Sequence, residues 1–175
     1  MLLSINMSII SEYLNVIHKK LSSNFDFSEN YSIDTLNFDF LASFNAVNTK
    51  FAVLKEIKIY GFETNEYFLL KTGQPQTKES LLNEIDIIKA HIRDIAQPHS
   101  EHMSSQILLV HIFEEEIPEE VAKIARRTKY QKGFAFGFKG WADLGLVVIS
   151  LKSNRVVTHK KFIKTASFFT PEKTV

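Results

Sequence analysis

Hydrophobic and polar residues follow helical spacing in some stretches of the chain and strand spacing in others. Ser8 suits the N-cap of a first helix, because apolar residues follow it at helical spacing as far as Leu21. From Leu36 onward, aromatic and small residues occupy alternate positions, which is typical of a half-buried strand. A turn at 48–49 then predicts a hairpin. The strands expected in this half of the chain cover 36–47, 50–62 and 66–71.

The clearest helical pattern follows Thr77, which suits an N-cap. Apolar residues step by four and three from Leu81 to Ile95, and Pro98 ends the helix. A strand at 105–113, a helix at 118–128 and strands at 133–138, 144–151 and 155–160 complete the pattern. The predicted fold is α+β, with helices packed on a single, mostly antiparallel sheet in the order α-βββ-α-β-α-βββ. We expect one domain over 1–175, with 1–7 and 166–175 loosely ordered.

Composition supports a globular domain and narrows its chemistry. The chain is 45% hydrophobic and holds 15 Phe but no Cys, which excludes disulfides, thiolate zinc sites and cysteine nucleophiles. The longest apolar run, at 145–151, is too short to span a bilayer, and the N-terminus lacks the pattern of a signal peptide. We therefore expect a cytoplasmic protein without a membrane partner.

Charge is distributed unevenly along the chain. Residues 1–116 hold 9 Lys/Arg against 16 Asp/Glu, whereas residues 117–175 hold 12 against 4. One interpretation is that the two halves complement each other within the fold. The other is that the C-terminal half presents a basic face to nucleic acid or to an acidic protein partner.

Three stretches carry a family resemblance: PHSEHMSSQILLVHI at 98–112, YQKGFAFGFKGWADLGLVVISL at 130–151 and RVVTHKK at 155–161. Together they resemble a family of uncharacterised bacterial and archaeal domains of unknown function. Its members carry Pro-His-x-x-His-Met before a strand and Lys-Gly-Trp-x-Asp between two later strands. The resemblance extends from about Leu36 to Lys164, and it implies no activity and no cofactor.

The first candidate site is a metal centre within PHSEHM. His99 and His102, with Asp94 just upstream, are ligand types that suit a divalent metal such as zinc or manganese. His91 and Glu84 on the preceding helix are the further possible ligands. The competing interpretation is structural: His99 caps the helix end and His102 packs against the next strand.

The second candidate is a Mg²⁺ site formed by Asp39, Glu56 and Lys58. A turn at 48–49 would place Asp39 opposite Lys58, and an Asp next to Glu-x-Lys resembles the site of restriction-endonuclease-like nucleases. In those enzymes the motif falls on later strands than it does here. The competing interpretation is an ion pair on a solvated face.

The third candidate is a nucleic-acid surface around KGFAFGF. Its first five residues match the start of the RNP1 pattern of RNA-recognition motifs, and a strand would place Phe134, Phe136 and Phe138 on one face. The match then fails at Gly137, and burial of the same face in the core is the competing interpretation. Trp141 is an anchor for the core or for a protein partner. The expected binding residues are Arg126, Arg127, Lys129, Lys132, Phe134, Phe136 and Trp141.

The nucleotide-binding P-loop, the dinucleotide fingerprint and the nucleophile elbow are all absent from the sequence. We therefore expect a domain that acts by binding, with its basic C-terminal half facing nucleic acid, an acidic protein or a second copy of itself. The alternative is a metal-dependent nuclease that uses Asp39, Glu56 and Lys58.

Overall fold

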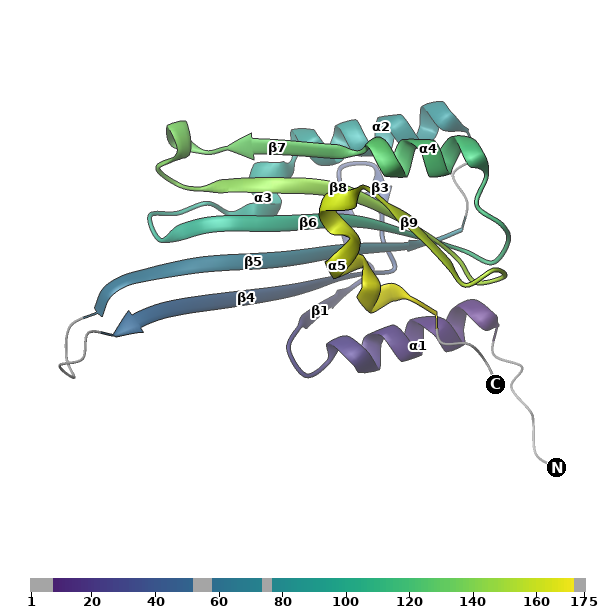
Figure 1. Cartoon of the computed structure of the whole chain (residues 1–175), viewed down its shortest axis with the longest axis horizontal. Coiled ribbons are helices and arrows are strands. Elements are labelled where there is room, and N and C mark those ends of the chain that lie inside the picture. The colour runs from purple at the N-terminus through teal and green to yellow at the C-terminus, as the bar shows by residue number, and fades with distance from the viewer. Residues whose placement is uncertain (1–7, 52–57, 74–76, 172–175) are drawn as a thin grey trace.

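The computed structural model describes residues 8–51, 58–73 and 77–171, and in these residues helices cover both faces of one mixed sheet (Figure 1). The sheet runs in the order β1-β4-β5-β6-β8-β7, and β9 pairs with the second half of β8. Its strands are β1 (Asp26–Glu29), β4 (Phe40–Phe51), β5 (Lys58–Thr72), β6 (His102–Phe113), β7 (Lys129–Gly133), β8 (Trp141–Ser150) and β9 (Arg155–Thr158). A separate two-stranded ladder pairs β2 (Ser32–Ile33) with β3 (Leu36–Asn37).

The helices fall between and after these strands. They are α1 (Ile9–Leu21), α2 (Lys78–Ala90), α3 (Ile92–Ala96), α4 (Glu119–Arg127) and α5 (Ile163–Ala166), with short 3₁₀ segments η1 (Ala135–Gly137), η2 (Lys160–Phe162) and η3 (Ser167–Phe169). The predicted α+β class is confirmed. The predicted α4 and both predicted N-caps, Ser8 and Thr77, are also confirmed, since each cap side chain accepts a backbone N–H of its helix.

Most strand pairs of the described sheet are antiparallel, as expected, but the sheet is mixed because its two central pairs are parallel. β5 pairs with β6 in parallel, and β6 pairs with β8 in parallel. The reason lies in the connections: α2 and α3 link β5 to β6, and α4 lies on the path from β6 to β8. The α2–α3 crossover returns the chain in the same direction, so β5 and β6 are parallel. After α4 the chain returns along β7, antiparallel to β6, and it reverses again at the turn between β7 and β8, so β8 is parallel to β6.

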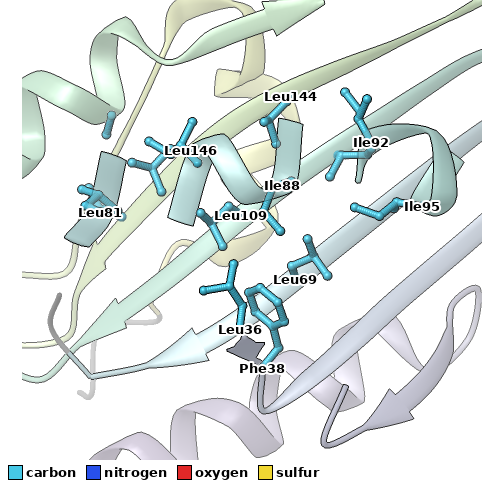
Figure 2. Close-up of a cluster of buried hydrophobic side chains, with 14 of the residues drawn as sticks. Leu36, Phe38, Leu69, Leu81, Ile88, Ile92, Ile95, Leu109, Leu144 and Leu146 are labelled. Atoms are coloured by element: carbon cyan, nitrogen blue, oxygen red, sulfur yellow. The ribbon is translucent and has the colours of Figure 1, made fainter. Parts of the chain in front are cut away.

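Two apolar cores lie on opposite faces of the sheet. One fills the space beneath α2, α3 and α4, and the other lies beneath α1 and the C-terminal segment. Figure 2 shows the first core, where Leu81, Ile88 and Ile92 point toward strand residues such as Leu109 and Leu146. All five of these side chains are fully buried. The helices and strands thereby form three layers, with the sheet in the middle.

One expected helix is divided into two. α2 ends at Ala90, His91 adopts a non-helical conformation, and α3 resumes at Ile92. Gln97 then takes a left-handed conformation (φ 45°) and ends α3 just before Pro98, the stop that the sequence predicted. The chain reverses there and enters β6.

Candidate functional site

A groove of about 460 Å³ opens between α2 and α4, next to the start of β7. Its lining combines the apolar side chains of Leu82, Ile85 and Ile124 with the ring of Tyr130 from β7. The charged residues that line it are Lys78, Lys89, Lys123, Arg127, Lys129 and Glu120. Five cations therefore face one carboxylate across an apolar floor, and a negatively charged ligand is favoured there.

Most of the cations that line this groove form no direct ion pair with a described residue. Lys89 pairs with Asp86 at 2.9 Å and also lies 5.6 Å from the centre of the Tyr130 ring. The other four cations form no ion pair with any residue that the structure describes. Arg126 lies outside the groove and bonds to Glu119 at 3.0 Å, which holds the pKa of that carboxyl below its usual range. Arg127 and Lys129 are therefore better placed to bind an anion than Arg126.

The loop between β7 and β8 exposes two phenylalanines. Ala135, Phe136 and Gly137 all have positive φ angles (47°, 55° and 91°), and the amide N–H of Gly137 donates to the carbonyl of Phe134. This turn leaves the Phe136 and Phe138 side chains almost fully exposed, at 104% and 86%. Phe134 is buried at 4%. We call residues 134–140 the hairpin tip.

The prediction of a strand over 133–138 with three phenylalanines on one face is therefore wrong. β7 ends at Gly133, because the positive φ angles that follow are incompatible with a strand. Phe134 belongs to the core and is removed from the expected binding residues, whereas Phe136 is exposed as a binding residue requires. Exposure of two large aromatic side chains on one tight turn is typical of an interaction surface.

His102 fixes the hairpin tip to the beginning of β6. Its Nδ1 lies 2.7 Å from the carbonyl oxygen of Lys139, and its Nε2 lies 2.8 Å from Ser105 Oγ. The carbonyl can only accept, so Nδ1 donates to it, and in the neutral imidazole Nε2 then accepts from the Ser105 hydroxyl. Gly140 (φ +69°) packs so closely that a Cβ atom there would lie 2.1 Å from the carbonyl oxygen of Met103. The PHSEHM and KGWADL stretches are thus in direct contact.

The three expected metal ligands do not converge. His99 Nε2 pairs with Glu63 Oε2 at 2.6 Å, and Asp94 pairs with His91 at 3.2 Å. His102 is occupied by the contacts that hold the hairpin tip. Within the described ranges, no three His, Asp or Glu side chains gather in a way that could hold a metal ion. The role of His102 resembles the structural interpretation, in which it packs at the start of the next strand.

The register of the β4–β5 hairpin contradicts the pairing expected for a nuclease site. Asp39 lies at the start of the hairpin, where its Oδ2 accepts the Thr72 amide N–H at 2.7 Å. Lys58 pairs with Phe51 at the opposite end of the same hairpin, about 40 Å away along β5 at 3.3 Å per residue. Glu56 lies outside the described residues. The predicted turn at 48–49 is wrong, because β4 continues as far as Phe51.

A buried ionic cluster lies between the sheet and α2. Lys71 of β5 and His111 of β6 are neighbours in register, and both contact the carboxylate of Glu84 from α2, His111 at 2.9 Å. Burial by itself would raise the pKa of Glu84, but the contacts with His111 and Lys71 outweigh it and leave the pKa lowered. Only 8% of the Glu84 side chain is exposed, so we assign this cluster to stability.

Sequence reasoning selected Arg127 and Lys129 but missed Lys78, Lys89 and Lys123, the other cations of the groove. Lys78 and Lys89 are eleven residues apart, which is three helical turns, and they therefore project from one side of α2. Lys123 and Arg127 are four residues apart on α4 and share a face in the same way. This spacing was visible in the sequence. The approach of the two helices to each other was not.

The fold and these surfaces define a three-layered α+β domain with a basic groove and an exposed aromatic loop. Among the described residues, no helix is long and apolar enough to cross a membrane. The chain belongs to the family described as Domain of unknown function (DUF8052), whose model matches residues 10–171. The expected membership of an uncharacterised family is confirmed, and the match begins earlier than the resemblance did. No curated protein and no solved structure matches the chain.

Proposed function

We propose that this domain binds single-stranded nucleic acid along the β7 edge, from the basic groove to the hairpin tip. β7 is the outermost strand of its half of the sheet. Unpaired cations flank its first residue, Lys129, and exposed Phe136 and Phe138 follow its last. Proteins that bind single strands combine cations for the phosphates with aromatic rings on which bases stack. The observation that carries the proposal is the presence of both features on one edge strand.

The dimensions of the β7 edge suit a short strand of nucleic acid. The five residues of β7 span about 17 Å at 3.3 Å per residue. At about 3.4 Å per stacked nucleotide, this length corresponds to about five nucleotides. Lys132 is exposed on the same face of β7 as Tyr130, which lines the groove, and it extends the positive charge of the groove toward the tip. A bound strand of nucleic acid would therefore contact the cations at the start of β7 and the aromatic rings beyond its end.

The salt dependence of binding follows from the number of free cations. Four cations of the groove form no ion pair with any described residue. Each phosphate that they neutralise contributes about −0.7 to the slope of log affinity against log salt for a single strand. The slope is then about −3, and affinity falls about 50-fold between 50 and 200 mM salt.

Fluorescence anisotropy with a labelled 12-mer oligodeoxythymidylate and a mixed-sequence 12-mer RNA tests the proposal. The double variant Phe136→Ala with Phe138→Ala removes the stacking rings, and we expect at least tenfold weaker binding with an unchanged salt slope. The double variant Lys123→Ala with Arg127→Ala removes two phosphate contacts, and we expect the slope to fall by about 1.4. Lys152→Ala is the matched control, because Lys152 is exposed, does not line the groove and already pairs with Glu115.

Two results would overturn the proposal. One is the absence of an anisotropy change for both 12-mers at 50 mM salt. The other is binding of an acidic, polyglutamate peptide that depends on Lys123 and Arg127 but is unaffected by loss of the two phenylalanines. That second result would assign the groove to an acidic protein partner.

A further inference from the structure

A second cavity, of about 330 Å³, lies on the sheet face opposite the α2–α4 groove. Two rows of side chains line it across β5, β6 and β8, because residues in register on neighbouring strands point the same way. One row is Thr64, Ser104 and Trp141, and the next is Glu66, Gln106 and Asp143. The following row begins with Phe68 and Leu108, which belong to the core beneath α1. The two rows that line the cavity therefore lie just beyond the part of this sheet face that belongs to the core beneath α1.

Asp143 is held firmly on one side of the cavity. Its Oδ1 pairs with Lys161 Nζ of η2 at 2.5 Å and accepts the side-chain amide of Gln131 at 3.1 Å. Only 6% of Asp143 is exposed. Both contacts are made by Oδ1 and connect Asp143 to η2 and β7, so Asp143 fixes the wall of the cavity.

Glu66 and Gln106 are not satisfied in this way. Glu66 has no hydrogen-bond or ion-pair partner among the described residues, and Gln106 Oε1 is buried without a partner. The two residues are in register on adjacent strands, so their backbones lie about 4.8 Å apart. Burial raises the pKa of Glu66 above its usual range. The Glu66 carboxylate gains its missing hydrogen bonds when a ligand supplies donors. The Gln106 side-chain amide Nε2 also has no hydrogen-bond partner among the described residues, so it can donate to an acceptor of the same ligand.

Trp141 provides an aromatic surface next to this pair. It is the only tryptophan of the chain, 37% of it is exposed, and its neighbours in the row are the small residues Thr64 and Ser104. β8 follows the hairpin tip directly (Figure 1), and Trp141 is the first residue of β8. A strand of nucleic acid that stacks on Phe136 and Phe138 would therefore bring its next base to this cavity.

We propose that the cavity binds a guanine base, stacked on Trp141 with its Watson–Crick edge toward Glu66 and Gln106. Guanine presents two adjacent donors, N1–H and N2–H, which one carboxylate accepts together, and its O6 accepts from the neighbouring amide. Adenine and cytosine each present a single amino group there, and uracil presents one ring N–H. Within a polynucleotide this inference rests on the proposed function, but a free guanine nucleotide tests the cavity independently.

Fluorescence of Trp141, excited at a wavelength that nucleotides do not absorb, reports directly on this cavity. We expect GMP to quench it and to bind at least tenfold more tightly than AMP, CMP or UMP, which carry the same phosphate. Glu66→Gln is expected to abolish this preference, whereas Glu29→Gln, which changes an exposed carboxylate on β1, leaves it intact. Because the ionised carboxylate accepts both donors, the affinity for GMP should rise as the pH rises through the raised pKa of Glu66.

Equal binding of all four nucleotides, or no quenching by GMP, would overturn the inference. Circular dichroism verifies that Glu66→Gln is folded, and Gln106→Leu provides a second variant that is expected to weaken GMP binding at least threefold. The variant Lys123→Ala with Arg127→Ala separates the two proposals. If this double variant binds GMP normally and neither it nor the wild type binds the 12-mers, the guanine site is supported and the proposed function is wrong. If the wild type binds the 12-mers but does not bind GMP, the proposed function is supported and the guanine site is wrong.

Discussion

The ionic cluster beneath α2 allows a quantitative test of how buried charge stabilises this fold. Glu84 lies between Lys71 and His111, and only 8% of its side chain is exposed. Glu84→Gln keeps the shape of the side chain but removes its charge. Breaking a buried ion pair by changing one partner costs about 3–5 kcal/mol. Since Lys71 is 30% exposed and can recover some hydration, we expect the lower part of this range, about 3 kcal/mol.

Urea denaturation followed by circular dichroism measures this cost. The midpoint should move to lower urea with an unchanged slope, and the melting temperature should fall by about 6–12 °C for a chain of this length. Asp86→Ala is the matched control, because Asp86 lies on the same helix, is 70% exposed and forms only a surface pair with Lys89. Its effect should stay within about 0.5 kcal/mol.

The pH dependence of stability provides a second readout of the same cluster. The pKa of Glu84 is lowered in the folded state, so its contribution is fully present above about pH 4.5, the value of an ordinary Glu, and is lost as the pH falls through the lower folded pKa. Glu84→Gln should therefore lose stability less steeply than the wild type as the pH falls below 4.5. A cost for Glu84→Gln no larger than that of Asp86→Ala, together with identical pH profiles, would refute this account of the cluster.

Three further substitutions test how the hairpin tip and the C-terminal segment are held. Gly140→Ala should lower the free energy of unfolding by about 3 kcal/mol in urea denaturation, because the new Cβ clashes with the backbone at Met103 and the residue has a left-handed conformation. Its control is Gly133→Ala, where the new Cβ meets open space and the loss should be less than about 1 kcal/mol. His102→Ala should lower the free energy of unfolding by about 2–3 kcal/mol, because the Lys139 carbonyl and the Ser105 hydroxyl lose their hydrogen-bond partner. Its control is His99→Ala: the His99 side chain is 47% exposed, so its loss should cost less than about 1 kcal/mol. Tyr13→Phe removes the buried hydroxyl that donates to the Phe169 carbonyl, and a loss of about 1 kcal/mol by thermal denaturation is expected. Equal stability of variant and control would contradict the first two arguments, and a Tyr13→Phe variant as stable as the wild type would contradict the third.

Much of the fold was predictable because it depends on local patterns. Ser8 and Thr77 cap their helices as their positions indicated, and the apolar spacing of α2 matches its buried face. The basic character of the C-terminal half was also visible, and it recurs in Arg127 and Lys129 at the groove. These features need only neighbouring residues, so the sequence carries their signal directly.

The hairpin register and the hairpin tip were not predictable in the same way. Polar residues at 48–49 indicated a turn, yet β4 passes through them, because the pairing of two long strands outweighs a weak local turn signal. Alternating phenylalanines after Gly133 indicated a strand, but three successive positive φ angles form a turn there. The contact of Gly140 with the chain at Met103 favours that turn, and a contact 37 residues distant leaves no local pattern.

The sequence by itself determined the α+β class, the ends of the main helices, the absence of disulfides and the unequal distribution of charge. Only the tertiary structure decided which strands run parallel, where α2 and α4 meet to form the basic groove, and which phenylalanines reach the surface. It also brought Glu66, Gln106 and Trp141 together from three separate strands. The physical reason is that helix caps and periodicity arise from residues adjacent in the chain, whereas grooves and cavities arise from packing between segments whose separation in sequence carries no periodic signal.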